Sequence, residues 1–105
     1  MITVERLVVS ISGLDPAELE RWIANEWVRP EGPPWRFREI DVARVRLIAE
    51  LRREMAIEED AMPVILSLLD QLYETRRQMR ALCGAIARAP DEMRARIAEL
   101  VRDEG

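Results

Sequence analysis

The side chains of this sequence that could take part in chemistry are carboxylates, arginines and one cysteine, because the chain contains no histidine. Without an imidazole there is no Ser-His or Cys-His nucleophile pair and no side chain that ordinarily titrates near neutral pH. Neighbouring carboxylates such as Glu58 and Glu59 could exchange protons with a substrate, but a solvated helix start provides no pocket for that chemistry. We therefore expect a protein that is not an enzyme and uses no cofactor or metal.

Cys83 is the single cysteine, so it can form neither an internal disulfide nor a CxxC metal clip. The start of the sequence does not resemble a signal peptide, and no stretch approaches the roughly 18 apolar residues of a membrane span. These features predict a cytoplasmic protein that does not enter a membrane.

The charges are unevenly distributed along the chain. Its 16 basic residues are all arginine, and its 20 acidic residues give a net charge of -4. The net charge is -3 over residues 1–28, +3 over 29–53, -6 over 54–75 and +2 over 76–105. The acidic band of the third segment consists of Glu54, Glu58, Glu59, Asp60, Asp70 and Glu74. It either faces a basic partner or is a solvated helix face with carboxylates at a helix start.

A chain of 105 residues with 49% apolar and 34% charged residues suits one folded domain, which we divide into 1–56 and 57–105. Thr3 is expected to cap a short helix from residue 4 to about 11, although the apolar run at 7–9 also suits a strand. A second helix should start at Asp15-Pro16. Its expected apolar face contains Leu19, Trp22, Ile23 and Trp27. The proline-rich stretch 29–34 and an extended segment at 35–38 should form a wing.

Three further helices are expected. Asp41 should cap the first of them, whose apolar stripe contains Val42, Val45, Ile48, Ala49 and Met55, widened by Leu47 and Leu51. The next should begin near Glu59 or Asp60, with Pro63 in its first turn, and run for about 25 residues, or about 37 Å. The last should extend from Asp91 to Arg102 with an apolar side formed by Met93, Ile97, Leu100 and Val101.

The long helix carries a heptad seam, with spacings that alternate between 4 and 3 residues. The seam consists of Ile65, Leu69, Leu72, Arg76, Met79, Cys83 and Ile86. Because this helix is longer than a domain of this size can cover, we expect part of its apolar face to meet a second subunit. The expected assembly is an antiparallel homodimer joined by this helix.

The chain resembles MerR-type helix-turn-helix proteins and, more closely, their small relatives, the chaperone-modulator proteins of the CbpM type. The resemblance extends from about Thr3 to Leu82 and rests on Trp35-x-Phe37, on residues 37–57, and above all on Pro63-Val64-Ile65-Leu66-Ser67-Leu68-Leu69-Asp70-Gln71-Leu72. It implies an all-α fold: a MerR-like helix-turn-helix N-terminal half with a small wing, then a long dimerisation helix. The chain departs from this pattern at Ala89-Pro90 and in the short C-terminal helix that follows.

The family resemblance also implies a function, which is to bind the J-domain of a CbpA-type or DnaJ-like cochaperone and to inhibit it. The J-domain surface that meets its chaperone is basic, so the acidic band is the expected contact. Met62, Leu66 and Tyr73 would be its apolar anchors if they are exposed.

Two alternatives remain at this stage. A MerR-like DNA-binding regulator would use Arg36, Arg38 and Arg44, although the second helix is mostly acidic on its polar side. The arginines of segment 29–53 could instead form ion pairs with nearby glutamates on the same helix, as in Arg46–Glu50 and Glu50–Arg53. The aromatic residues Trp22, Trp27, Trp35 and Phe37 have the spacing of core residues more than of a platform for nucleic-acid bases. The second alternative is that the chain is a dimerisation module whose partner is not a J-domain.

Overall fold

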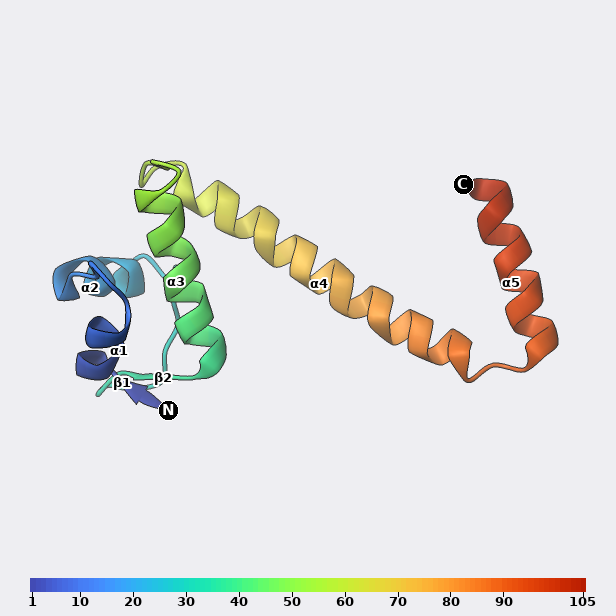
Figure 1. Ribbon diagram of the computed structural model, residues 1–105, viewed down its shortest axis with the longest axis horizontal. Helices are drawn as coiled ribbons and strands as arrows, with labels where there is room; N and C mark the ends of the chain where they lie inside the picture. Colours follow the sequence, from blue (N-terminus) through green and yellow to red (C-terminus); the bar gives the residue numbers. More distant parts are fainter. The chain divides into compact units, whose positions relative to one another are not determined.

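The computed structural model describes all 105 residues, which form two compact units, Met1–Leu66 and Ser67–Gly105. The chain is mostly helical, as expected, and its only sheet is small (Figure 1). The elements are β1 (Ile2–Thr3), α1 (Val4–Ser10), α2 (Pro16–Ala24), β2 (Arg36–Phe37), α3 (Glu39–Arg53), α4 (Met62–Ala87) and α5 (Asp91–Glu104). The first unit extends past residue 56 because Met62 and Leu66, at the start of α4, are buried in its core.

The starts of α1 and α2 follow their capping residues. The Thr3 hydroxyl accepts a hydrogen bond from the Arg6 amide at 3.4 Å, and an Asp15 carboxylate oxygen accepts one from the Ala17 amide at 2.9 Å. Each bond satisfies one of the amides that a helix start leaves without an intrahelical partner. Residues 7–9 are therefore helical, and the turn after α1 is made at Gly13, which has a φ of 77°.

The second helix ends earlier than its apolar spacing suggests. It stops at Ala24, and Glu26 takes a left-handed conformation with a φ of 61°. The amides of Trp27 and Glu26 then donate to the carbonyls of Trp22 and Ile23 at 2.9 and 3.0 Å, which is the Schellman arrangement of a helix end. Trp27 is buried, but it reaches the core from this turn and not from the helix.

The wing is anchored by the sheet. β1 and β2 are antiparallel, with Ile2 opposite Phe37 and Thr3 opposite Arg36. Arg36 also exchanges two backbone hydrogen bonds with Glu31, which closes the proline-rich loop. Phe37 is fully buried while Trp35 is half-buried, so the predicted alternation places one aromatic side chain fully in the core.

The third helix begins before Asp41, so the expectation that Asp41 is its N-cap is wrong. Arg38 is the N-cap, and Asp41, three positions later, accepts a hydrogen bond from the Arg38 amide at 2.9 Å. Asp41 therefore satisfies the helix start from inside the first turn, as the third residue of a capping box does. α3 ends at Arg53, so Met55 lies beyond the helix and is 65% exposed rather than part of its apolar stripe.

The core of the first unit is formed by side chains from α1, α2, β2, α3, their connections and the first turn of α4. Its fully buried larger side chains are Trp22, Phe37, Leu7, Leu19, Ile48, Met62, Val28 and Val45. In Figure 1, α1, α2 and α3 lie together, with the sheet near the start of α3. Because Met62, in the first turn of α4, is part of this core, the connection between α3 and α4 begins and ends in the same unit.

The second unit has no comparable core. From Ser67 to Gly105, on α4 and α5, no residue is buried. α4 begins at Met62, after Glu59 and Asp60, so these two residues lie in the preceding turn and not in the first helical turn that was predicted. No helix in the structure is long and apolar enough to cross a membrane.

Candidate functional site

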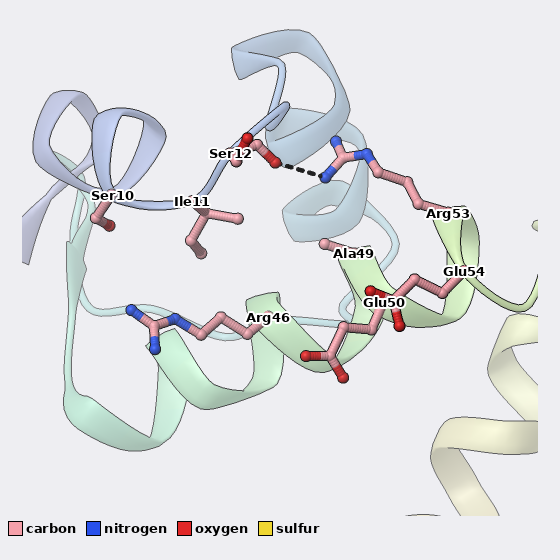
Figure 2. A pocket seen from close by; sticks show the side chains of 8 residues that line it. All are labelled: Ser10, Ile11, Ser12, Arg46, Ala49, Glu50, Arg53 and Glu54. Carbon is pink, nitrogen blue, oxygen red and sulfur yellow. Dashed lines mark hydrogen bonds between the residues drawn. The ribbon is translucent and has the colours of Figure 1, made fainter.

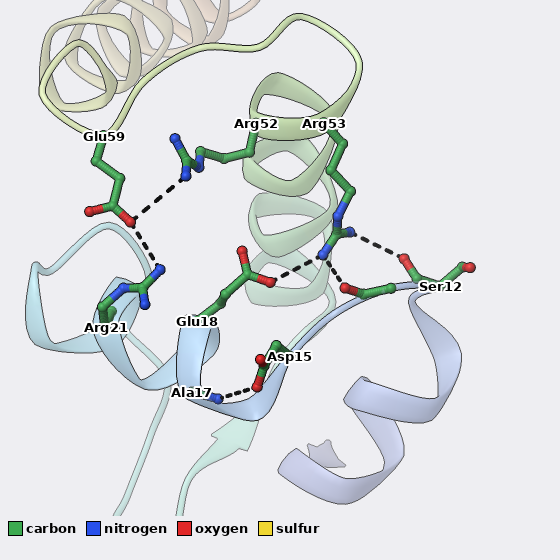
Figure 3. A network of polar contacts seen from close by, with 9 residues as sticks. Ser12, Asp15, Ala17, Glu18, Arg21, Arg52, Arg53 and Glu59 are labelled. Carbon is green, nitrogen blue, oxygen red and sulfur yellow. Dashed lines mark hydrogen bonds and ion pairs between the residues drawn. The ribbon is translucent and has the colours of Figure 1, made fainter.

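The connection between α3 and α4 is held in place by two arginines (Figure 3). Arg52 donates to the carbonyl of Ile57 at 2.9 Å and lies 3.9 Å from the Glu59 carboxylate. Arg21 of α2 donates to the same carboxylate at 3.0 Å. Glu59 thus ties this connection to two helices of the first unit.

Three other carboxylates of this connection are exposed and form no hydrogen bond or ion pair. They are Glu54, Glu58 and Asp60, which we call the acidic loop. Glu59, which was predicted to contact a partner together with them, is instead engaged in holding the loop. The structure thus separates three carboxylates that face solvent from one that positions them.

The apolar residues beside the acidic loop differ from those expected. Met62 and Leu66 are 0% and 3% exposed, so the prediction that they form an exposed contact surface is wrong. The exposed apolar side chains here are Met55 and Val64, at 65% and 62%. The exposure of Met55 could not be predicted, because Met55 continues the 3.6-residue period of α3 beyond the point where that helix ends.

The remaining predicted contact residues lie on α4 within the second unit. Tyr73 is 51% exposed, as a contact residue should be. Glu74 pairs with Arg77 one turn further on and accepts a hydrogen bond from Gln78 at 3.3 Å. Asp70 is exposed. Whether these three residues contact a partner stays a prediction.

The seam residues on α4 form a partly exposed stripe that is apolar except at Arg76. Leu72 and Met79 are 43% and 56% exposed, and Cys83 is also exposed. Ile65, Leu69 and Ile86 are half-buried, and Arg76 is exposed. No seam residue is fully buried.

Most arginines of the basic segment 29–53 bind groups of the first unit. Arg53 donates to the carbonyls of Ser12 and Gly13 and pairs with Glu18 at 3.3 Å, so the expected pairing with Glu50 is wrong (Figure 3). Arg44 donates to the carbonyl of Trp27 at 2.9 Å.

Arg38 binds the buried carboxylate of Asp41 through Nε and Nη2, at 2.9 and 3.1 Å. This hydrogen bonding, together with the charge of Asp41, raises the pKa of the Arg38 guanidinium above its ordinary value. Two of the three arginines expected to contact DNA, Arg38 and Arg44, therefore already bind groups of the protein.

The first unit contains open pockets, two of which are defined by the residues that line them. One, of about 260 Å³, lies between the end of α1 and α3 and is lined by Ser10, Ile11, Ser12, Arg46, Ala49, Glu50, Arg53 and Glu54 (Figure 2). Its two arginines and two glutamates balance, so it favours neither an anion nor a cation. The other, of about 620 Å³, adjoins the sheet and is lined by Met1, Ile2, Phe37, Arg38, Glu39, Val42, Ala43 and Arg46. No group of three or more metal-ligating side chains is present.

No protein-family model matches this chain, and neither a curated protein nor a solved structure is significantly similar to it.

Proposed function

We propose that this protein binds the J-domain of a DnaJ-like cochaperone through the acidic loop and thereby restrains the cochaperone. The observation that carries this proposal is that Glu54, Glu58 and Asp60 are exposed and unpaired on a loop fixed by Arg52 and Glu59. The resemblance to chaperone-modulator proteins of the CbpM type supports the choice of partner. No catalytic step is part of this function.

A fixed loop suits recognition of a basic surface. Carboxylates without internal partners keep their full attraction for a basic protein, and they mainly raise the association rate and select the partner. Because the loop is already tied to α2 and α3, less conformational entropy is lost on binding. Met55 and Val64 are exposed in the same part of the chain and are the apolar candidates for the contact.

The acidic loop can be tested by charge reversal. We expect Glu54→Arg, Glu58→Arg and Asp60→Arg together to lower the association rate with a purified J-domain about 10-fold or more, measured by biolayer interferometry at low salt. Glu59 is left unchanged, because its reversal would also break the contacts that hold the loop. Equal association rates for this variant and the unaltered protein would contradict the proposal.

A matched control carries the same charge change on the same unit. Glu5, Glu20 and Glu26 are exposed and unpaired. The variant in which these three are changed to arginine should associate with the J-domain much faster than the variant with the reversed acidic loop. If both variants weaken binding equally, net charge and not the acidic loop determines association. Binding to duplex DNA that falls steeply with salt and requires Arg36 would favour the MerR-like alternative.

We further propose that the protein works as an antiparallel homodimer joined along α4. The second unit has no buried residue, yet its part of the seam exposes Leu72 and Met79. The first half of this segment of α4 carries Asp70 and Glu74, and the second half carries arginines at 76, 77 and 80. These charges lie mostly at outer positions of the helix, so they act between copies only at longer range, where antiparallel copies bring the acidic half of one helix alongside the basic half of the other.

The direction of the helices can be tested with disulfides. In an antiparallel pair that places Leu69 of one copy opposite Ile86 of the other, Leu72 lies opposite Cys83. Leu72→Cys should therefore give a covalent dimer on mild oxidation. The unaltered protein, and Leu72→Cys combined with Cys83→Ser, each retain one cysteine and should stay uncrosslinked. Crosslinking of both single-cysteine proteins would instead indicate parallel helices, and a protein that stays monomeric in sedimentation experiments would contradict the dimer.

A further inference from the structure

The apolar face of α4 is wider than its seam. In the heptad, Leu69, Arg76 and Cys83 take position a, and Ile65, Leu72, Met79 and Ile86 take position d. Leu68 and Leu82 both take position g, beside the seam, and are 60% and 57% exposed. A two-stranded coiled coil needs apolar residues only at a and d, whereas a helix of a bundle adds e or g. Two copies of α4 alone would therefore leave the g side uncovered.

A second uncovered apolar face lies on α5, in the same unit. Met93, Leu100 and Val101 are 56%, 52% and 63% exposed, and no residue of α5 is buried. The spacing of Met93, Ile97, Leu100 and Val101 places them on one side of the helix. At about 1.5 Å per residue, the 14 residues of α5 span about 21 Å, and residues 67–87 of α4 span about 31 Å. One α5 can therefore cover about two thirds of that length.

We propose that α5 docks on the g side of the α4 pair, so that the second units of two copies form a four-helix bundle. This inference rests on the antiparallel dimer proposed above. In an antiparallel pair the g positions of both helices share one side, with Leu82 of one copy near Leu68 of the other. Only Arg88 to Pro90 separate α4 from α5, so each α5 starts beside its own Leu82 and the Leu68 of the second copy. The apolar face of α5 covers both leucines.

The occupant of this surface is thus a second copy of the chain and not an unrelated protein. The opposite charges of the two halves of α4 favour that copy in antiparallel orientation. A single chain supplies one α4 and one α5, which leaves the seam open even when α5 folds back. The two-fold arrangement covers the seam with α4 and the g side with α5, as in four-helix bundles.

The first experiment measures the dimer dissociation constant of the full chain by sedimentation equilibrium. Ile97→Ser with Leu100→Ser should raise this constant at least about 10-fold, because apolar side chains of both copies lose their buried positions. The control, Ala95→Ser with Arg102→Ser, places the same residue type on the opposite side of α5 and should change it much less. Circular dichroism checks that α5 stays helical in both variants.

A second experiment locates α5. In a Cys83→Ser background, Leu68→Cys with Met93→Cys should form disulfide-linked dimers, because Met93 of one copy lies near Leu68 of the other. Each single-cysteine variant is a control that should not crosslink. The docking of α5 is overturned if this pair stays uncrosslinked and the Ile97→Ser, Leu100→Ser variant dimerises like its control. If the Leu72→Cys protein still forms the seam disulfide in that case, the antiparallel dimer stands.

Discussion

At the scale of single residues, Asp41 shows how one side chain can serve two structural purposes. Asp41 is 5% exposed, and its carboxylate accepts hydrogen bonds from the amide and the guanidinium of Arg38. It therefore satisfies an amide at the start of α3 and neutralises the arginine that flanks β2. A buried acceptor of this kind is costly to remove, because its donors are left without partners.

We expect Asp41→Ala to lower the free energy of unfolding by about 1–3 kcal/mol, since the Arg38 amide loses its acceptor near the core. Asp41→Asn should cost less, because its side-chain carbonyl can still accept from that amide. Urea denaturation followed by circular dichroism measures both values. A loss for Asp41→Ala no larger than that for Asp41→Asn would contradict this role.

Contacts between residues close in the chain could be predicted from the sequence, whereas contacts between distant residues could not. Thr3 and Asp15 were correctly predicted as caps because their hydrogen bonds join residues two or three positions apart. Arg53, by contrast, binds Ser12 and Gly13, about 40 residues earlier in the chain. Such a contact depends on how α1, α2 and α3 pack, so local spacing suggested the wrong partner.

At the scale of the elements, the capped starts of α1 and α2 could be predicted, but the ends of α2 and α3 could not. A start has a preferred residue type at its cap, whereas α2 and α3 end before residues with positive φ that are not glycine, Glu26 and Ala56. The apolar period also continued past both ends, to Trp27 and Met55. The burial of Met62 could not be predicted either, because it depends on where the α3–α4 connection places the start of α4.

The end of α2 gives a stability prediction. Glu26 occupies the left-handed position of the Schellman turn, which glycine adopts without steric cost. Glu26→Gly should therefore raise the free energy of unfolding by about 0.5–1 kcal/mol, measured by thermal denaturation. Ala43→Gly, at an exposed helical position of α3, is the control and should lower it by about 1 kcal/mol. A loss of stability in both variants would mean that the left-handed turn is not retained in solution.

The connection between α3 and α4 gives a prediction that separates positioning from contact. Glu59→Gln weakens the pairs with Arg21 and Arg52, which are partly exposed, so stability should fall by less than about 1 kcal/mol. J-domain affinity should nevertheless fall several-fold, because the acidic loop is no longer held before binding. Glu20→Gln removes an exposed carboxylate without a partner and is the matched control in calorimetric titrations. Equal affinities for the two variants would show that the loop needs no such support.

At the scale of the whole molecule, the two units differ in how they are stabilised. The first buries a core of its own, whereas the second buries none of its residues. If the second unit depends on a second copy, its melting temperature should rise with protein concentration, because association stabilises only the folded form. The transition of the first unit should stay nearly constant. Circular dichroism at several concentrations measures both, and concentration-independent melting of the entire chain would contradict this difference.

The three tryptophans all lie in the first unit, where Trp22 and Trp27 are buried and Trp35 is half-buried. The second unit has only Tyr73 as an aromatic side chain. Intrinsic tryptophan emission is thus an optical probe of the first unit alone, while the far-ultraviolet signal reports the helices of both. In the unaltered, unlabelled protein, these two signals therefore distinguish unfolding of the unit that holds the acidic loop from unfolding of the unit that carries the seam.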